Sequence, residues 1–334
     1  MPRVAVLMPA RDAGRTVRAA AVSILRQTVR DLALVAVEDG SRDATPDVLR
    51  ALAARDRRVV VVPGPGQGIA GALQRGLSRC DAEVVARMDA DDVAFPRRLE
   101  RQLDLLDSDA SLQAVGSRVR LFPRRAVAPG MRRYAEWLNG LVSPALVERD
   151  LYVESPIAHP AAAIRREALE GAGGWRDGDF PEDYDLWLRI AAGGGRLSNA
   201  PEVLLDWRES SARLTRVDPR YGVEKFLSLK ARHLAAGPLA GHREVALWGA
   251  GETGRALARA LGREGVAVAL FVEVDPKKMG RRVLGAEVIS FDQVERVRGL
   301  PLLVAVGAPR ARDLIRAELA RRGFEELRDY RCAA

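Results

Sequence analysis

The sequence predicts an α/β protein built on a doubly wound, mostly parallel sheet, with a smaller α/β unit after it. Short apolar runs alternate with helical patterns through the first half, and a second strand–helix series follows a Gly237-Pro238 linker. The chain has 334 residues and 48% hydrophobic residues, which suits two domains. We expect domains at 1–215 and 243–334, joined by a connecting helix and linker at 216–242.

Buried strands are expected where compact apolar runs end at turn residues, at Val4–Met8, Leu32–Val37, Val59–Val62 and Val84–Met88. Apolar residues at helical spacing predict helices at Thr16–Arg26, Ile69–Leu77, Glu182–Ala192 and Tyr221–Ala236. We expect Thr45 to cap a further helix, with Pro46 at its first position. The stretch from 110 to 180 has no regular period, so we expect loops and helices there.

Length, apolar runs and cysteine content exclude several classes of protein. No apolar run approaches the roughly 18–20 residues of a membrane span, and the N-terminus has no signal-peptide pattern. Cys80 and Cys332 stand far apart, without metal-ligand spacing. We therefore expect no disulfide framework and no zinc site, and a cytoplasmic location.

The chain is basic, with a formal net charge of +8. Because nearly all its basic residues are arginine, we attribute the charge to codon usage and expect no nucleic-acid partner. One local run has two interpretations, a solvated face or a contact with lipid phosphates or a phosphorylated acceptor: Arg118, Arg120, Arg124, Arg125, Arg132 and Arg133. Peripheral association with the inner face of a membrane therefore stays open.

An acidic cluster, Asp89-Ala90-Asp91-Asp92, follows the fourth expected strand. Neighbouring carboxylates repel one another unless water or a cation neutralises them. Mg²⁺ and Mn²⁺ prefer oxygen ligands and often share them with substrate phosphates. The cluster is thus either a metal–diphosphate site or a solvated turn in which Asp92 caps a helix.

Two further acidic motifs lie where ligands bind in such sheets or where a helix begins. Asp39 ends the second strand, where a carboxylate can accept a hydrogen bond from a nucleobase or ribose. Glu182 and Asp183 open a helix and offer a general base for an acceptor hydroxyl. An Asp-Gly turn and acidic residues favoured by the helix dipole are the structural alternatives.

Taken together, these motifs resemble inverting family 2 glycosyltransferases of the GT-A fold over roughly residues 2–215. The segments that match in order are Val4–Asp12, Val37–Ser41, Gln67–Gly76, Arg87–Asp92 with Pro96 and Arg98–Glu100, and Glu182-Asp183. Departures from the family pattern are Arg11, Asp12, Glu38, Gly66 and Gln74, which bear on the donor's base and sugar.

The resemblance implies transfer of a sugar from a nucleotide-sugar donor, most often a UDP-sugar, to a glycan or lipid-linked acceptor hydroxyl, with inversion. It implies Mn²⁺ or Mg²⁺ at Asp91 and makes Asp183, beside Glu182, the catalytic base. The donor-binding residues that it implies are Pro9, Ala10, Arg11, Asp39, Gly68, Arg87 and Asp89.

Two further features between and after these motifs are open to two interpretations each. His159 either touches the metal or is a structural histidine. Trp207 and Arg208 either close over the diphosphate, which suits an arginine, or pack and remain solvated.

The second domain contains a G-x-G-x-x-G motif at Gly249, Gly251 and Gly254, between an expected strand and helix. Asp275 lies about 20 residues beyond, where ribose is held in Rossmann folds. We expect a Rossmann-like domain of about 90 residues that binds a nucleotide, mediates homo-oligomer assembly or is purely structural. The rival functions are an NAD-dependent sugar-nucleotide oxidoreductase or epimerase and a non-catalytic nucleotide sensor, but residues 243–334 hold no Tyr-x-x-x-Lys.

Overall fold

The computed structural model describes residues 2–211, 213–308 and 310–334, which divide into two compact units. The first unit contains the chain up to Glu148 and Ser155–Val217, and the second contains Arg149–Glu154 and Asp218–Ala334. The predicted connecting helix, α10 (Val223–Ala236), is therefore part of the second unit and does not stand outside both.

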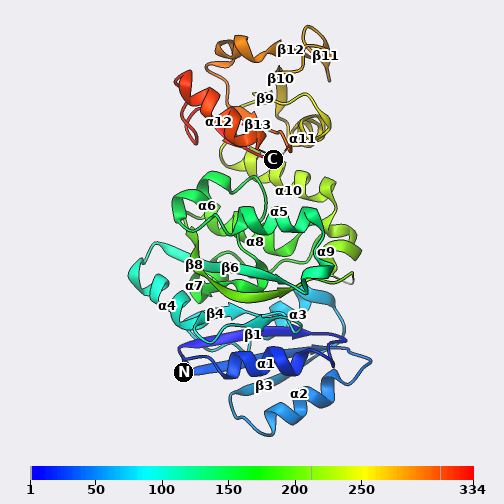
Figure 1. Cartoon of the computed structure of the whole chain (residues 1–334), viewed down its shortest axis with the longest axis vertical. Coiled ribbons are helices and arrows are strands. Elements are labelled where there is room, and N and C mark those ends of the chain that lie inside the picture. The colour runs from blue at the N-terminus through cyan, green and yellow to red at the C-terminus, as the bar shows by residue number, and fades with distance from the viewer. Residues whose placement is uncertain (1, 212, 309) are drawn as a thin grey trace. The chain divides into compact units, whose positions relative to one another are not determined.

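A single eight-stranded sheet forms the centre of the first unit (Figure 1). Its strands are β1 (Val4–Ala10), β2 (Leu32–Asp39), β3 (Val59–Gly64), β4 (Val84–Arg87), β5 (Val93–Ala94), β6 (Leu112–Phe122), β7 (Ala163–Arg165) and β8 (Arg196–Arg208). They lie in the order β3-β2-β1-β4-β7-β6-β8-β5. Only the pairs made by β7 and β5 are antiparallel, so the predicted mostly parallel sheet is confirmed for the residues described.

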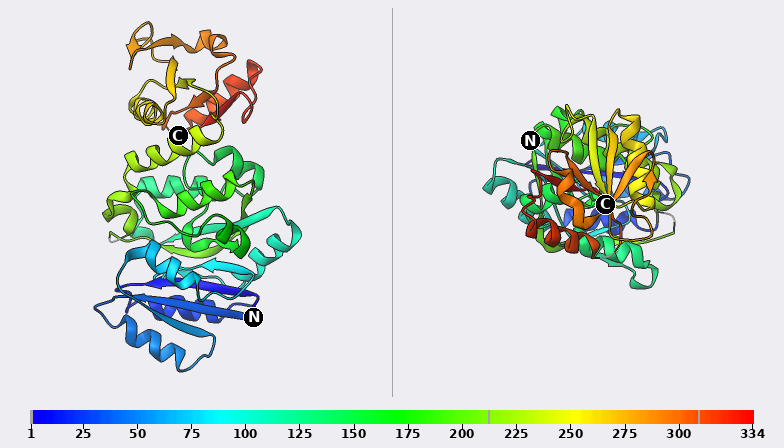
Figure 2. Two further views of the ribbon diagram at one scale, coloured as in Figure 1. Left: turned by 180° about the vertical axis from the view of Figure 1, so that it is seen from behind. Right: turned by 90° about the horizontal axis from the view of Figure 1, so that it is seen from above.

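Helices cover both faces of this sheet (Figures 1 and 2). They are α1 (Val17–Leu25), α2 (Thr45–Ala53), α3 (Gly68–Leu77), α4 (Arg98–Ser108), α5 (Pro129–Leu138), α6 (Pro144–Asp150), α7 (Arg166–Gly171), α8 (Glu182–Ala192), α9 (Leu214–Val217), and the 3₁₀ helices η1 (Arg124–Ala126) and η2 (His159–Ala161). Val4, Val6 and Met8 of β1 share a core with α1. On the other face α3 packs so closely that a Cβ at Gly76 would lie 2.2 Å from Leu7 Cδ1.

One local prediction for the first unit was wrong, and one was incomplete. Thr45 is the first residue of α2 and does not cap it; Asp43 Oδ1 accepts the Thr45 N–H at 2.9 Å. The stretch expected to be loops and helices contains β6, the long strand paired with β8. A Cβ at Gly116 of β6 would lie 2.1 Å from Asn199 Oδ1, so β6 depends on a tertiary contact that its own sequence does not reveal.

The second unit contains a smaller sheet whose strands lie side by side (Figure 2). Its elements are β9 (Glu244–Trp248), α11 (Glu252–Arg263), β10 (Ala267–Glu273), β11 (Arg282–Val283), β12 (Ala286–Ser290), β13 (Leu302–Val304), α12 (Ala311–Arg321), β14 (Tyr330–Cys332), and the 3₁₀ helices η3 (Pro219–Tyr221) and η4 (Phe291–Val297). The strands lie in the order β11-β12-β10-β9-β13-β14, with β10, β12 and β11 on one side of β9 and β13 and β14 on the other. Its strand order thus reverses beside β9, the strand that leads into the glycine turn.

The short segment Arg149–Glu154 is fixed within the second unit by buried charges. Lys230 Nζ donates to Val153 O at 2.6 Å and to Ala333 O at 3.2 Å, and burial lowers the pKa of this amine. Arg316 forms ion pairs with Asp150 and with Glu326. These contacts explain why six residues between two stretches of the first unit belong to the other unit.

No helix in the described part of the chain combines the length and the apolar character needed to cross a membrane.

We predict that Cys80 and Cys332 are both inert to thiol reagents in the native protein. Both are buried and free, and burial raises the pKa of each thiol to about 12. The thiolate fraction near pH 8 should then fall about a thousandfold below that of an exposed cysteine. A dithionitrobenzoate assay at pH 8 should show negligible early release from the native chain and reaction of both thiols in denaturant. Rapid reaction of either native thiol would contradict this prediction.

Candidate functional site

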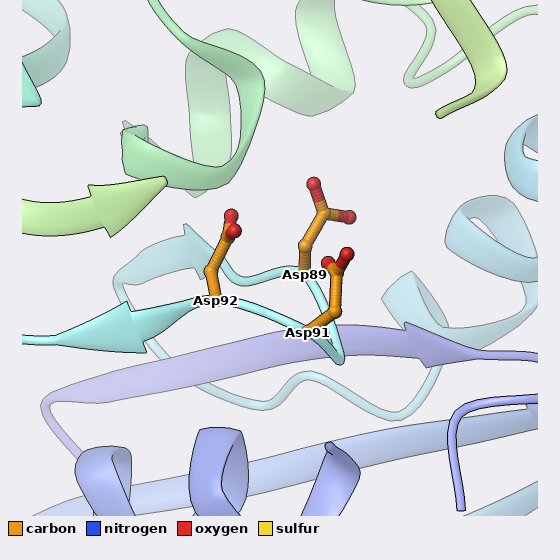
Figure 3. Close-up of side chains that lie close together, drawn as sticks. All are labelled: Asp89, Asp91 and Asp92. Carbon is orange, nitrogen blue, oxygen red and sulfur yellow. The ribbon is translucent and has the colours of Figure 1, made fainter. Parts of the chain in front are cut away.

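Three carboxylates gather where the chain leaves β4 for β5. Oxygen atoms of Asp89, Asp91 and Asp92 all lie within 4.8 Å of one another. Figure 3 shows the three side chains projecting to the same side of the loop. The edge is the one that the sequence predicted, at the carboxyl end of a parallel strand.

Residues of β4 and β8 fix the acidic loop in place. Arg87, buried at the end of β4, pairs through Nη1 with Asp89 Oδ1 at 2.5 Å. Arg208, at the end of β8, donates its backbone N–H to Asp92 Oδ1 at 2.7 Å and its Nε–H to Asp91 O at 2.6 Å. Arg208 thus holds the loop instead of extending freely over a ligand.

The three carboxylates differ in their ionisation. Burial and the charge of Asp89 raise the pKa of Asp91 to about 6, and burial and both neighbours raise the pKa of Asp92. Burial also opposes ionisation of Asp89, but the ion pair with Arg87 outweighs it and lowers the pKa of that carboxyl. An added positive charge at this point would therefore be strongly favourable.

The residues present fit a hard divalent cation. The donor set consists of carboxylate oxygens, which Mg²⁺ and Mn²⁺ prefer. Asp92 Oδ2 is buried and has no hydrogen-bond partner among the described residues, and such an orphaned oxygen calls for a ligand. Asp92 is 1% exposed and lies before α4, whose cap position is Arg97, so the alternative of Asp92 as a helix cap was wrong.

Arg98 is the first residue of α4. It belongs to a segment that matches the family pattern, but the sequence predicted no role for it. Its guanidinium is fully buried and donates from Nη2 to Arg87 O at 2.5 Å and from Nε to Gln102 Oε1 at 3.2 Å. Burial lowers the pKa of Arg98 to about 9, while the charge of Asp92 opposes this shift. Arg98 therefore supplies a buried positive charge that acts on Asp92 and Asp89.

Arg213 is a residue of the site that no pattern in the sequence indicated. Its guanidinium lies 4.2 Å from the centre of the Trp207 ring, and its charge helps to stabilise the ionised forms of all three carboxylates. It also pairs with Glu209 at 3.4 Å. Trp207 thus packs against an arginine beside the site.

Asp39, which was expected to contact the nucleotide-sugar donor, binds the loop before α3. Its carboxylate accepts N–H bonds from Gly66 at 2.9 Å, Gln67 at 3.1 Å and Gly68 at 2.9 Å, and the residue is only 3% exposed. Asp39 therefore joins the end of β2 to the start of α3. Any contact with a nucleobase has to share these oxygens.

The other expected donor residues lie along the same strand edge. Pro9 and Ala10 end β1 and pair with β2, and Arg11 follows them with an exposed side chain. Gly68 begins α3 with a φ of +83°. Pro9, Ala10 and Arg87 are at the carboxyl ends of β1 and β4, and Arg11 and Asp89 lie just beyond these ends.

His159 does not fit the metal role considered for it. Its Nε2 accepts the indole N–H of Trp175 at 2.9 Å, and its Nδ1 faces Glu182 Oε1 at 3.4 Å. Burial and then Arg87 lower the pKa of His159, although Glu182 opposes this. Both ring nitrogens are engaged by protein groups, so the structural interpretation replaces the metal one.

The two acids at the start of α8 have different environments. Glu182 is 1% exposed and faces His159. Asp183 is half-buried, and Ser155 Oγ donates to its Oδ2 at 3.5 Å. Of the pair, only Asp183 keeps partial access to a substrate hydroxyl.

The glycine turn of the second unit follows β9 closely. Gly249 has a φ of +113°, and a Cβ at Gly254 would lie 1.8 Å from Gly249 O, whereas a Cβ at Gly251 meets nothing within 4 Å. Asp275 lies beyond β10 and is 40% exposed, while Glu273 at the strand end accepts the Ala250 N–H at 3.1 Å. The carboxylate of Glu273 is thus occupied by a hydrogen bond from the glycine turn.

Comparison with known proteins agrees with this geometry. The model of the family described as "Glycosyl transferase family 2" matches residues 5–173. The amylovoran biosynthesis glycosyltransferase AmsE of Erwinia amylovora is 32% identical over 194 residues, 57% of this chain and 69% of AmsE. The UDP-Gal:alpha-D-GlcNAc-diphosphoundecaprenol beta-1,3-galactosyltransferase of Escherichia coli is 29% identical over 167 residues, 50% of this chain and 58% of that enzyme.

Among solved structures, the mannosyltransferase PcManGT of Pyrobaculum calidifontis, in complex with GDP-Man and Mn²⁺, is similar in fold. It covers 70% of this chain and 62% of its own, with a TM-score of 0.50 and 23% sequence identity. The expected resemblance is confirmed: this chain belongs to glycosyl transferase family 2 and is a glycosyltransferase of the GT-A fold.

Proposed function

We propose that this glycosyltransferase moves a sugar from a UDP-sugar to an acceptor hydroxyl with inversion, in the synthesis of a polysaccharide or glycoconjugate. The observation that carries the proposal is the cluster of Asp89, Asp91 and Asp92 with the orphaned Asp92 Oδ2. A relative that uses UDP-Gal and another that serves amylovoran biosynthesis support the donor and the product class. The rival oxidoreductase and sensor functions are not proposed, because the matching family consists of sugar transferases.

A divalent metal, Mn²⁺ or Mg²⁺, would be held by the carboxylates of the acidic loop. When bound, it stabilises negative charge on the departing nucleoside diphosphate. We propose Asp91 as its direct ligand, because Asp89 Oδ1 is already paired with Arg87 and Asp92 is almost fully buried. The partnerless Asp92 Oδ2 remains as a second oxygen for the metal. Asp89 then faces the donor, and Arg213 adds positive charge near the leaving group.

Asp183 is proposed as the catalytic base. It takes the proton of the acceptor hydroxyl, and the oxygen forms a bond to the anomeric carbon as the bond from that carbon to the diphosphate breaks. The electron pair of the broken bond leaves with the nucleoside diphosphate, and the configuration inverts. Glu182 contacts His159, and Trp175 holds His159 in place by a hydrogen bond. These contacts orient the first turn of α8, which carries Asp183.

The acceptor is proposed to be a glycan or a lipid-linked sugar. Support for the lipid-linked form comes from the galactosyltransferase relative, whose acceptor is a sugar on diphosphoundecaprenol. Such an acceptor requires the enzyme to work at a membrane surface. We therefore include peripheral association with the inner, cytoplasmic face of a membrane in this proposal.

For the second unit we propose a nucleotide site at the glycine turn, with self-association as the alternative role. The reversal of strand order beside β9 and the open side of Gly251 support a ligand there. We propose Asp275 as the carboxylate for a ribose, because its side chain is 40% exposed whereas that of Glu273 is 8% exposed. Lys278 lies near both acids, 3.1 Å from Glu273 and 3.8 Å from Asp275.

We predict that Asp91→Asn abolishes metal-dependent binding of UDP. The variant removes the proposed ligand charge and should weaken UDP binding in the presence of Mn²⁺ by at least about a hundredfold. Isothermal titration of UDP with and without Mn²⁺ measures this. Asp47→Asn, which alters an exposed carboxylate of α2, is the matched control. Unchanged Mn²⁺-dependent affinity in Asp91→Asn would contradict the assignment.

We predict that Asp183→Asn lowers kcat by about 10²–10⁴ because the general base is lost. Binding of UDP with Mn²⁺ should not change, since Asp183 acts on the acceptor. Release of nucleoside diphosphate in a screen of UDP-sugars and acceptors measures the rate, with Asp104→Asn of α4 as the control. A variant with full kcat would rule out Asp183 as the base.

We predict that Gly251→Val blocks the second unit's nucleotide site without unfolding the protein. Gly251 has a φ of −79°, which any residue adopts, and the added side chain enters open space. Titration with UDP, AMP and NAD⁺ in an Asp91→Asn background isolates this site, and Gly262→Ala of α11 is the control. If the parent binds none of the three, the nucleotide role is wrong, and light scattering of the same sample tests self-association.

A further inference from the structure

Four arginines form an exposed basic patch on η1 and α5 of the first unit. Arg124, Arg125, Arg132 and Arg133 are all exposed, and their side chains have no hydrogen bond or ion pair within the described part of the chain. They are four of the six arginines in the run that the sequence singled out. We call these four the α5 patch.

The other two arginines of the run have partners. Arg118 Nε donates to Asn139 O at 2.8 Å. Arg120 forms a two-pronged ion pair with Asp206, at 2.6 and 2.8 Å. The fold thus gives the side chains of both arginines on β6 a partner and leaves those of the α5 patch available.

The α5 patch borders a hollow of about 340 Å³ between β6 and α5. Val119, Leu121 and Val127 contribute apolar walls, and Arg124 and Arg132 lie on its lining with a single acid, Glu136. A guanidinium binds phosphate oxygens through two parallel hydrogen bonds. The hollow therefore combines phosphate-binding groups with an apolar recess.

We propose that the α5 patch docks the enzyme on an anionic phospholipid surface. Clustered arginines are attracted by the negative potential of such a surface. The apolar recess beside them suits the first carbons below a lipid headgroup, whereas a nucleic-acid backbone has no need of apolar walls. Charge and shape thus favour a lipid over the other polyanion.

The α5 patch lies next in sequence to the strand that borders the sugar-transfer site. In the β6–β8 ladder, Leu121 pairs with Trp207 and Phe122 pairs with Arg208. Arg208 is the residue that holds Asp91 and Asp92. Docking through the α5 patch brings a lipid-borne acceptor to this side of the unit, which rests on the lipid-linked acceptor proposed above.

The test is sedimentation of the full chain with vesicles. One set contains phosphatidylcholine alone, and the other contains roughly one-third phosphatidylglycerol, both at about 0.1 M salt. The patch variant changes Arg124, Arg125, Arg132 and Arg133 to Gln. The control variant changes four exposed arginines of α1 and α2 and their ends to Gln: Arg18, Arg26, Arg55 and Arg57. Both variants remove four charges from the formal net charge of +8.

The parent and the control variant should sediment with the anionic vesicles only. The patch variant should bind them at least about a hundredfold more weakly, at unchanged melting temperature. Equal loss in both variants, binding to neutral vesicles, or no binding of the parent would overturn the proposal. Preference for duplex DNA over anionic vesicles would also overturn it and indicate a nucleic-acid surface.

The sedimentation result is separate from the proposed catalysis. Mn²⁺-dependent UDP binding should be the same in the parent and the patch variant, since none of the four arginines contacts the acidic cluster. If the chain binds vesicles but transfers no sugar, the proposed function fails and the docking surface stands. If it transfers sugar to a soluble acceptor but ignores vesicles, the docking surface fails alone.

Discussion

Repulsion among three carboxylates within 4.8 Å of one another is the constraint around which the first unit is arranged. The chain answers it with charges and hydrogen-bond donors from three elements. Arg87 of β4 pairs with Asp89, the buried Arg98 of α4 adds a positive charge, and the backbone N–H of Arg208 in β8 donates to Asp92. These contacts leave Asp92 Oδ2 without a partner, so the protein neutralises the cluster only in part. The remaining negative charge suits a cation.

The sequence predicted the elements whose signal is local. The runs that became β1, β2, β3 and β4 are apolar enough to be recognised without knowledge of their neighbours, and α8 has the predicted limits, Glu182–Ala192. β6 was missed because it carries Gly116, Ser117 and two arginines, whose places depend on Asn199, Asn139 and Asp206. In the second unit, β11, β12, β14 and α12 were not expected.

The candidate site shows the same division. The acidic cluster is contiguous in sequence, so motif reading located it. The limited access to Asp39, the engaged nitrogens of His159 and the buried charge of Arg98 depend on residues far along the chain. The chain also contains a second G-x-G-x-x-G match, at Gly66, Gly68 and Gly71. In both matches a carboxylate at the end of a neighbouring strand, Asp39 or Glu273, accepts loop N–H groups. The pattern alone cannot separate such a braced loop from a ligand-binding one.

The segment Arg149–Glu154 interleaves the two units along the chain. The chain enters the second unit for six residues, returns for Ser155–Val217, and then leaves again. Contacts with Lys230 and Arg316 hold the segment in the second unit. Replacing the second unit by recombination at residue 218 would leave these six residues without their partners. The two units should therefore be exchanged together.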